Sequence, residues 1–235
     1  MKTYYSNINN FILLTQDLDN LSFEKKYENF LQILDKNKKD SVLGKKKDED
    51  KLRSLVGAIL IHKAIDDYNK AATPYFMEYI PNSKNMPITK KLKFAYAKDG
   101  KPYLEDFKDF AFSISHSKDL VCASLCHKDE FDKIGIDIQF KAGKKSDLIA
   151  KRFYSDFEKD FLDSIDECNK KDVFFDIWAA KEAYVKMTGD GLKKDFKSFD
   201  ADITKGSIYE NNKIAAKITN IPISPIYSTY IATPL

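Results

Sequence analysis

Long apolar runs are absent from this chain of 235 residues. No stretch approaches the roughly 20 apolar residues that span a bilayer, so we expect no membrane segment and no membrane partner. The first residues, MKTYYSNINNFILL, also lack the charged start, apolar run and small-residue cleavage site of a secretory signal. The sequence therefore predicts a soluble protein.

An excess of one charge is also lacking. The chain has 39 Lys and Arg against 36 Asp and Glu, for a net charge of +3. This balance argues against a nucleic-acid binder, although local basic clusters can still bind phosphates. Hydrophobic residues make up 43% of the chain and aromatic residues 13%, which predicts a folded core rather than disorder.

Cysteine is scarce and shows no framework spacing. Cys122 and Cys126 lie in the apolar run LVCASLC, and Cys168 stands alone. We expect the first two to pack as small hydrophobic side chains. The alternative, a metal site that includes the neighbouring His127, lacks an evident fourth ligand. Reduced thiols and the missing signal indicate a cytoplasmic protein.

One stretch organises the chain: residues 176–192, DIWAAKEAYVKMTGDGL. Trp178 and Val185 are seven residues apart, on one apolar stripe of a helix. The intervening residues are good helix formers. Gly189 and Gly191 are expected to end the helix, because glycine readily takes the left-handed conformation that closes one.

Polar residues lie beside this apolar stripe. Lys181, Glu182 and Lys186 fall within about a turn and a half, and Glu182 and Lys186, four apart, are neighbours on the helix surface. By themselves they fit an ordinary Glu–Lys pair on an exposed helix, worth a few tenths of a kcal/mol. Only other parts of the sequence can favour a functional role.

The remaining pattern predicts an α+β fold with largely antiparallel sheets. The basic segment 35–51 has the composition of a solvated loop. The dipeptide Asp99-Gly100 predicts a hairpin turn. Helices are expected over 23–34, 51–68 and 146–165, and strands over 111–117, 120–126, 133–140, 196–203, 213–221 and 227–233.

The strand KIGIDIQF, residues 133–140, places three polar or small residues on one face: Gly135, Asp137 and Gln139. A carboxylate in mid-strand is costly if it is buried and unpaired. An exposed strand face would explain it, but Gly135 suggests that something approaches the backbone closely here. Asp137 is therefore a candidate metal ligand.

Three motifs in a fixed order carry a resemblance: FSISHS, then GIDIQF, then WAAKEAYVKMTGDGL. The segments GKPYL, RFYSDFE and LRSLVGA extend it over roughly residues 35 to 195. The chain resembles the 4′-phosphopantetheinyl transferases of the broad-specificity type, the group that contains the enzyme activating surfactin synthetase. The order and spacing of the motifs make the resemblance specific.

The resemblance implies two similar α/β-layered halves, residues 1–127 and 128–235, related by a pseudo-twofold axis with coenzyme A between them. The implied reaction is that of a holo-[acyl-carrier-protein] synthase. It moves the phosphopantetheine arm of coenzyme A to a serine of an apo acyl, polyketide or peptidyl carrier protein and releases 3′,5′-ADP. We expect a monomer.

The resemblance also implies a magnesium site. Asp137 and Glu182 would hold Mg²⁺, because one or two carboxylates plus substrate phosphates are its usual ligands. Glu182 would accept the serine proton, directly or through a metal-bound water. Lys186 would stabilise the leaving group. Gln139 stands where the family often has an acid, and would reach the metal directly or leave that place to a water.

Six residues match the coenzyme A site of the family. Ser115 and His116 would hold the 3′-phosphate, and Lys101 would lie near that phosphate and the adenine. The others are a nucleotide-binding pair, Arg53 and Ser54, and a basic residue in the segment after residue 35, Lys38.

Two other functions stay open at this point. A different Mg²⁺-dependent phosphotransferase or nucleotide hydrolase would turn over coenzyme A or a nucleotide without a carrier protein. A non-enzymatic coenzyme A or nucleotide sensor would bind without releasing 3′,5′-ADP. The Asp137, Glu182 and Lys186 set argues against the sensor.

Overall fold

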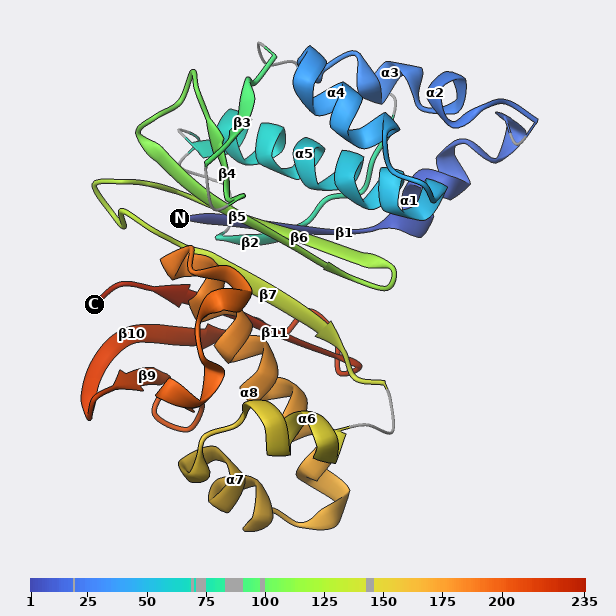
Figure 1. Cartoon of the computed structure of the whole chain (residues 1–235). Coiled ribbons are helices and arrows are strands. Elements are labelled where there is room, and N and C mark those ends of the chain that lie inside the picture. The colour runs from blue at the N-terminus through green and yellow to red at the C-terminus, as the bar shows by residue number, and fades with distance from the viewer. Residues whose placement is uncertain (19, 69, 71–74, 83–90, 98–99, 143–145) are drawn as a thin grey trace. The chain divides into compact units, whose positions relative to one another are not determined.

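The computed structural model describes residues 1–235 except 19, 69, 71–74, 83–90, 98–99 and 143–145. The chain divides into two compact units, Met1–Glu130 and Phe131–Leu235 (Figure 1). The predicted boundary after residue 127 lies just before this division. Each unit has its own sheet and its own long helix.

The sheet of the first unit has the order β2-β1-β6-β5. Its pairs are antiparallel except β1 with β2. The strands are β1 (Lys2–Asn7), β2 (Phe76–Glu78), β5 (Phe110–Ser117) and β6 (Leu120–His127). Cys122 and Cys126 on β6 are buried, as expected of small hydrophobic side chains.

A separate two-stranded sheet contains β3 (Phe94–Tyr96) and β4 (Pro102–Leu104), paired antiparallel. Gly100, between them, has φ 87°, which only glycine adopts without strain. A hairpin is therefore present where the sequence predicts one. Asp99, the first residue of the predicted turn, lies outside the described residues.

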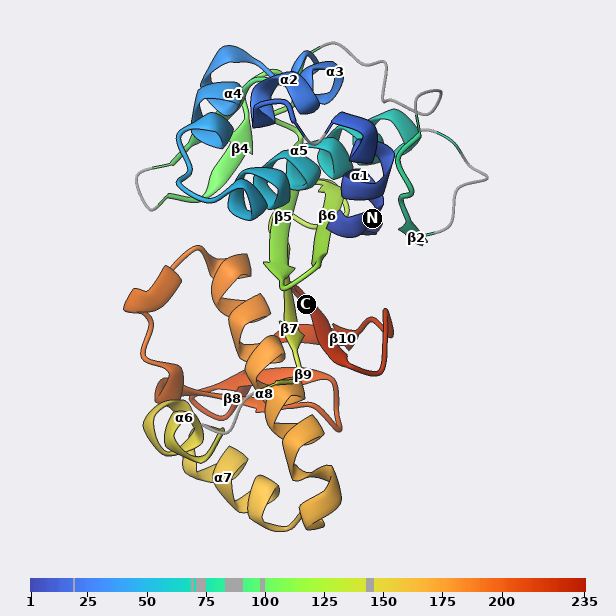
Figure 2. The same ribbon diagram turned by 90° about the vertical axis from the view of Figure 1, so that its right-hand side faces the viewer.

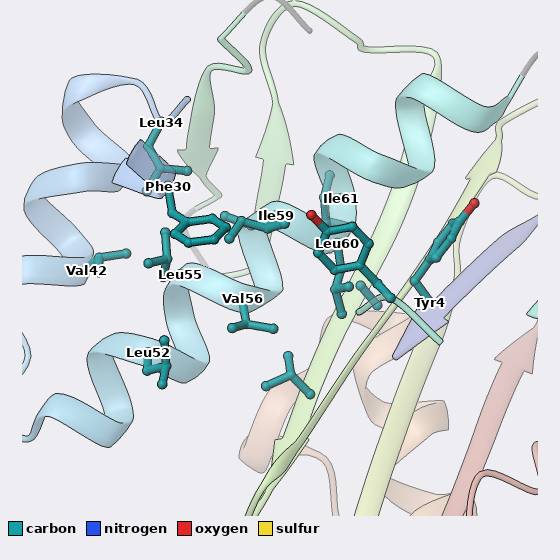
Figure 3. Close-up of a cluster of buried hydrophobic side chains, with 14 of the residues drawn as sticks. Tyr4, Phe30, Leu34, Val42, Leu52, Leu55, Val56, Ile59, Leu60 and Ile61 are labelled. Carbon is teal, nitrogen blue, oxygen red and sulfur yellow. The ribbon is translucent and has the colours of Figure 1, made fainter. Parts of the chain in front are cut away.

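The core of the first unit is built on α5 (Asp48–Tyr68), which packs against β1, β5 and β6. Figure 3 shows its side chains Leu55, Val56, Ile59 and Leu60 among those of the shorter helices and β1. The shorter helical elements are α1 (Ile8–Leu14), η1 (Gln16–Leu18), α2 (Phe23–Lys26), α3 (Glu28–Leu31) and α4 (Lys36–Leu43).

Two predictions in this unit are wrong. The helix expected over 23–34 is two short helices, α2 and α3, that meet at Tyr27. The basic segment expected to be a loop contains the helix α4. Asp35 caps it, because its carboxylate accepts hydrogen bonds from the backbone N–H groups of Asn37 and Lys38. Val42 anchors the helix in the core.

The second unit has a five-stranded sheet in the order β7-β11-β10-β9-β8, antiparallel throughout. Figure 2 labels four of these strands, β7 to β10, together with helix α8. Its helix α8 (Glu167–Thr188) packs on β7 and β11. The other elements are β7 (Gly135–Phe140), α6 (Ser146–Phe153), α7 (Asp156–Asp163), η2 (Gly191–Lys193), η3 (Phe196–Ser198), β8 (Phe199–Asp202), β9 (Ser207–Glu210), β10 (Lys213–Asn220) and β11 (Tyr227–Thr233).

The ends of these helices follow capping chemistry. Gly189 has φ 82° and its N–H donates to the carbonyl of Val185 at 3.0 Å, so α8 ends at the first of the two glycines. The single helix expected over 146–165 is α6 and α7. Ser155 separates them because it forms a reciprocal capping box with Glu158.

The predicted fold class, α+β with largely antiparallel sheets, is confirmed. Within the described residues, no helix is both long and apolar enough to cross a membrane. The pseudo-twofold relation between the halves stays a prediction.

Candidate active site

Helix α8 lies directly on the backbone of β7 at Gly135. A Cβ atom at this position would be 1.9 Å from the carbonyl oxygen of Ala183 and 2.5 Å from the amide nitrogen of Met187. Only glycine leaves room for a helix backbone this close. The close approach predicted for Gly135 is therefore made by α8, and Lys186 of this helix reaches Asp137 on β7.

Asp137 lies two residues after Gly135, on the same face of β7, and is 2% exposed. Its Oδ1 accepts a hydrogen bond from Nζ of Lys186 at 2.6 Å, and its Oδ2 accepts from Nε2 of Gln139 at 2.7 Å. The carboxylate is thus buried but paired, which offsets much of the cost of burying its charge.

Glu182 lies one turn before Lys186 on α8 and is partly buried. Burial raises the pKa of its carboxyl, and the nearby charge of Asp137 raises it further, while Lys186 lowers it. The two carboxylates therefore lie near each other and near the ammonium of Lys186. The sequence predicts that Lys186 pairs with Glu182 along the helix. In the structure Lys186 forms an ion pair with Asp137 on β7.

The donor set of this region fits a magnesium ion. Mg²⁺ is commonly held by one or two carboxylates together with substrate phosphates and waters. Asp137 and Glu182 supply two carboxylates. Burial, and after it the negative charge of Asp137, raises the pKa of Glu182, and a cation would neutralise that charge. Among the described residues, no cluster of three or more His, Cys, Asp or Glu side chains gathers to hold a metal, so substrate oxygens or waters would complete the coordination.

Lys181 and Glu158 form a pair that the sequence reading did not assign. Lys181 precedes Glu182 but points into the core, where its Nζ donates to Oε1 of Glu158 at 2.5 Å and to the carbonyl of Phe199 at 2.7 Å. Glu158 also accepts from the backbone of Ser155 and of Ala201. Both side chains are 0% exposed. They tie α8 to α7 and β8 behind the site.

Burial of this pair acts on both ionisable groups. It raises the pKa of Glu158 and lowers the pKa of Lys181, because low-dielectric surroundings disfavour each charge. Four hydrogen bonds offset that cost. The sequence contains one sign of this pair, the segment RFYSDFE, which ends at Glu158. A sequence alone does not show which acidic residue a buried lysine contacts.

In the first unit, two of the predicted coenzyme A residues make contact. Lys38 on α4 donates from Nζ to the hydroxyl of Ser54 on α5 at 3.4 Å, and its ammonium lies 5.4 Å from the ring centroid of Phe94. Burial lowers the pKa of Lys38, although Tyr96 and Asp35 act in the opposite direction. Lys38 is 8% exposed, which is unusual for a lysine.

Arg53 contacts the turn that follows β5, the strand that contains the motif FSISHS. Its Nε donates to the carbonyl of Lys118 at 2.7 Å, and its other nitrogens pair with Asp50 and Glu49. Lys118 follows β5, so Arg53 lies close to the strand end that carries His116.

Ser115 and His116 have side chains on opposite faces of β5. Ile114 contacts α5 at Gly57, so His116, two residues further, lies on the α5 face, and Ser115 lies on the other. His116 is exposed and Ser115 is buried. Lys101, at the start of β4, is partly exposed.

Several known proteins are similar to parts or most of this chain. The 4′-phosphopantetheinyl transferase superfamily matches residues 133–226, a span that includes Asp137, Glu182 and Lys186. The transferase HetI of Nostoc is 40% identical over 109 residues, 44% of each chain. The transferase Sfp of Bacillus subtilis is 28% identical over 216 residues, 90% of this chain and 83% of Sfp. A holo-(acyl-carrier-protein) synthase of Bacillus anthracis in complex with coenzyme A (3′,5′-ADP) has a TM-score of 0.38 and 20% identity over 44% of this chain and 96% of its own.

Residues 133–226 match the 4′-phosphopantetheinyl transferase superfamily, and relatives that bear this name are similar to further parts of the chain. Similarity to Sfp extends over most of the chain, so the resemblance expected from the sequence is confirmed. The chain spans less than half of HetI, the relative of higher identity, and most of Sfp.

Proposed function

We propose that this protein transfers the 4′-phosphopantetheine arm of coenzyme A to a serine of an apo carrier protein and releases 3′,5′-ADP. The observation that carries the proposal is the convergence of Asp137, Glu182 and Lys186, which Gly135 makes possible by admitting α8 to the strand backbone. The match of residues 133–226 to the 4′-phosphopantetheinyl transferase superfamily supports it.

The reaction forms a bond between the serine Oγ and the phosphorus that carries pantetheine, and breaks the bond from that phosphorus to the bridging oxygen of 3′,5′-ADP. Glu182 accepts the serine proton, and its raised pKa brings it closer to the range in which a carboxylate is an effective base. Lys186 stabilises the negative charge that develops on the leaving diphosphate oxygen.

Asp137 and Glu182 would hold Mg²⁺, which supplies further charge neutralisation at the diphosphate when it is bound. Asp137 is suited to this role because β7 fixes its position and Gln139 orients its carboxylate. Glu182 accepts a proton only when its carboxylate is ionised, so transfer should fall when the pH drops below the pKa that this carboxyl has with the metal bound.

The nucleotide end of coenzyme A would be bound by the first unit. Lys38, Arg53, Lys101 and His116 supply basic side chains, and Ser54 and Ser115 supply hydroxyl groups. The contact between Lys38 and Ser54 supports a common role for these two. We further propose that the enzyme is a cytoplasmic monomer and that its acceptors are carriers of fatty-acid, polyketide or peptide synthesis.

The test is incubation with coenzyme A, Mg²⁺ and a panel of apo carrier proteins, read by intact-protein mass spectrometry. A carrier whose acceptor serine is replaced by alanine is the matched control. The proposal expects a mass gain of one phosphopantetheine on the serine carrier only. Release of 3′,5′-ADP or hydrolysis of a nucleotide without any carrier would instead identify another phosphotransferase or a hydrolase. Binding of coenzyme A with no release would identify a sensor.

A further inference from the structure

Both oxygens of the Asp137 carboxylate receive a donor from the chain itself. Lys186 occupies Oδ1 with a full positive charge, and Gln139 occupies Oδ2 with a neutral amide N–H. A divalent cation at Asp137 would need a lone pair of this carboxylate at about 2.0–2.1 Å. It would then lie close to the ammonium of Lys186, and two cations that share one carboxylate repel each other.

The two partners of Asp137 differ in their freedom to leave. The side chain of Asp137 is 3% exposed, and that of Lys186 is 31% exposed, on a flexible four-carbon stem. Gln139 lies on the same strand, two residues from Asp137, so the strand keeps it in place. The ammonium can therefore turn outward while the carboxylate and the amide stay where they are.

We propose that Lys186 is the resident counter-ion of Asp137, that a divalent cation must displace it, and that the diphosphate of coenzyme A assists by drawing the ammonium to itself. Metal and coenzyme A then bind cooperatively. That coenzyme A supplies the diphosphate rests on the proposed function. The competition between Lys186 and a metal rests on the contacts of Asp137 alone.

Gln139 contributes to this arrangement through its nitrogen. Because the amide N–H points to Asp137, its carbonyl oxygen is directed away from that carboxylate. In this orientation Gln139 holds Asp137 for either cation but adds no negative charge. A glutamate at this position would add one, so Gln139→Glu should favour the divalent ion over the single charge of Lys186.

The proposal predicts weak metal binding by the protein alone. Coupling between two ligands of one protein commonly changes affinity by about 5- to 150-fold. We expect removal of the Lys186 charge to tighten metal binding in the absence of coenzyme A by roughly tenfold or more. Linkage also requires the metal to change the affinity for coenzyme A by the same factor by which coenzyme A changes the affinity for the metal.

The experiment titrates Mn²⁺ into the full-length protein without coenzyme A and follows the loss of the free-ion signal by electron paramagnetic resonance. The variants are Lys186→Met and Lys186→Gln, of which the second keeps a hydrogen-bond donor to Asp137. Lys170→Met is the matched control, because Lys170 lies on the same helix and pairs with Glu167. Asp137→Asn verifies which site is measured.

Both Lys186 variants should bind Mn²⁺ at least about tenfold more tightly than the parent, Lys170→Met should bind like the parent, and Asp137→Asn should lose the site. Unchanged or weaker binding by the folded Lys186 variants would overturn the proposal. If one variant does not fold, the other decides.

A second titration tests the role of coenzyme A. Calorimetry in a metal-free buffer compares coenzyme A binding by the parent and by Lys186→Gln. The proposal expects weaker binding by the variant, because the ammonium that meets the diphosphate is gone. Equal binding would refute that step. Neither titration measures transfer, so a failed carrier assay with intact metal competition would remove the proposed function and leave the competition standing.

Discussion

The carbonyl oxygen of Ala183 lies where the side chain of residue 135 would begin. A Cβ atom on Gly135 would be only 1.9 Å from it, a distance that no packed structure tolerates. Because both partners are backbone, neither can turn aside as a side chain would. The distance between α8 and β7 therefore depends on glycine at position 135, which has no side chain. The same distance sets where Glu182 and Lys186 lie relative to Asp137.

We expect Gly135→Ala to lower the free energy of unfolding by about 3 kcal/mol or more, because overpacking against rigid backbone is costly. Transfer activity should fall even in the fraction that folds. The matched control is Gly57→Ala on α5, where the added methyl meets the side chain of Ile114 at 2.9 Å and that side chain can shift. Chemical denaturation compares the two, and equal losses would contradict the assignment.

The buried pair Lys181–Glu158 should behave as a structural tie. Replacing Lys181 by Met leaves Glu158 buried with a lost partner, and removal of one member of such a pair typically costs about 3–5 kcal/mol. The double variant Lys181→Met, Glu158→Leu should recover part of this loss, because no uncompensated charge is left. Denaturant unfolding of Lys181→Met, of Glu158→Leu and of the double variant measures the coupling, and strictly additive losses would argue against a paired role.

Asp67 should make the first unit sensitive to acid. Burial raises the pKa of its carboxyl, but hydrogen bonds from Lys63, Lys70 and Tyr4 outweigh that effect and lower it to about 2. Because the ordinary value is about 3.9, the ionised Asp67 stabilises the fold fully above about pH 4, and this contribution is lost as the pH falls towards 2.

Asp67→Asn should therefore cost about 1–2 kcal/mol at neutral pH. The difference from the parent should shrink as the pH falls from about 4 to 2. Urea unfolding at a series of pH values measures both curves. Parallel curves across this interval would show that Asp67 is not the group responsible.

His116 is predicted to meet the 3′-phosphate of coenzyme A. A charge-assisted hydrogen bond contributes about 1.5–3 kcal/mol, so His116→Ala should raise the KM for coenzyme A by roughly ten- to hundredfold. The KM for 3′-dephospho-coenzyme A should change much less. His127→Ala, at the end of β6, is the control because it replaces a second histidine of the same unit. Equal losses for both substrates would place His116 elsewhere.

The fold class and most strands could be predicted because alternation and helical periodicity are local. The helix α8 and its end at Gly189 follow from pattern and glycine chemistry. Strand β9, residues 207–210, was not predicted, because four residues carry too little periodicity. The helix α4 was missed because its lysines resemble a solvated loop, and only tertiary packing buries Lys38 and Val42.

The site could be predicted only in part. The spacing of motifs identified Asp137, Glu182 and Lys186, and Gly135 indicated a close approach without revealing what approaches. The partner of each side chain depends on the fold. Lys186 was expected beside Glu182 along the helix, yet it reaches across to Asp137 on the strand. Likewise, nothing in the sequence shows that Lys181 points inward to Glu158 while Glu182 points to the site.

The most direct test of the account is transfer by Glu182→Gln, measured as the mass gain of an apo carrier with saturating Mg²⁺ and coenzyme A. This variant keeps the shape of the side chain and removes both its charge and its ability to accept the serine proton. The circular dichroism spectrum and thermal unfolding should match the parent, because Glu182 lies on a partly exposed face. The account predicts a folded protein with no detectable transfer; turnover near that of the parent would contradict it.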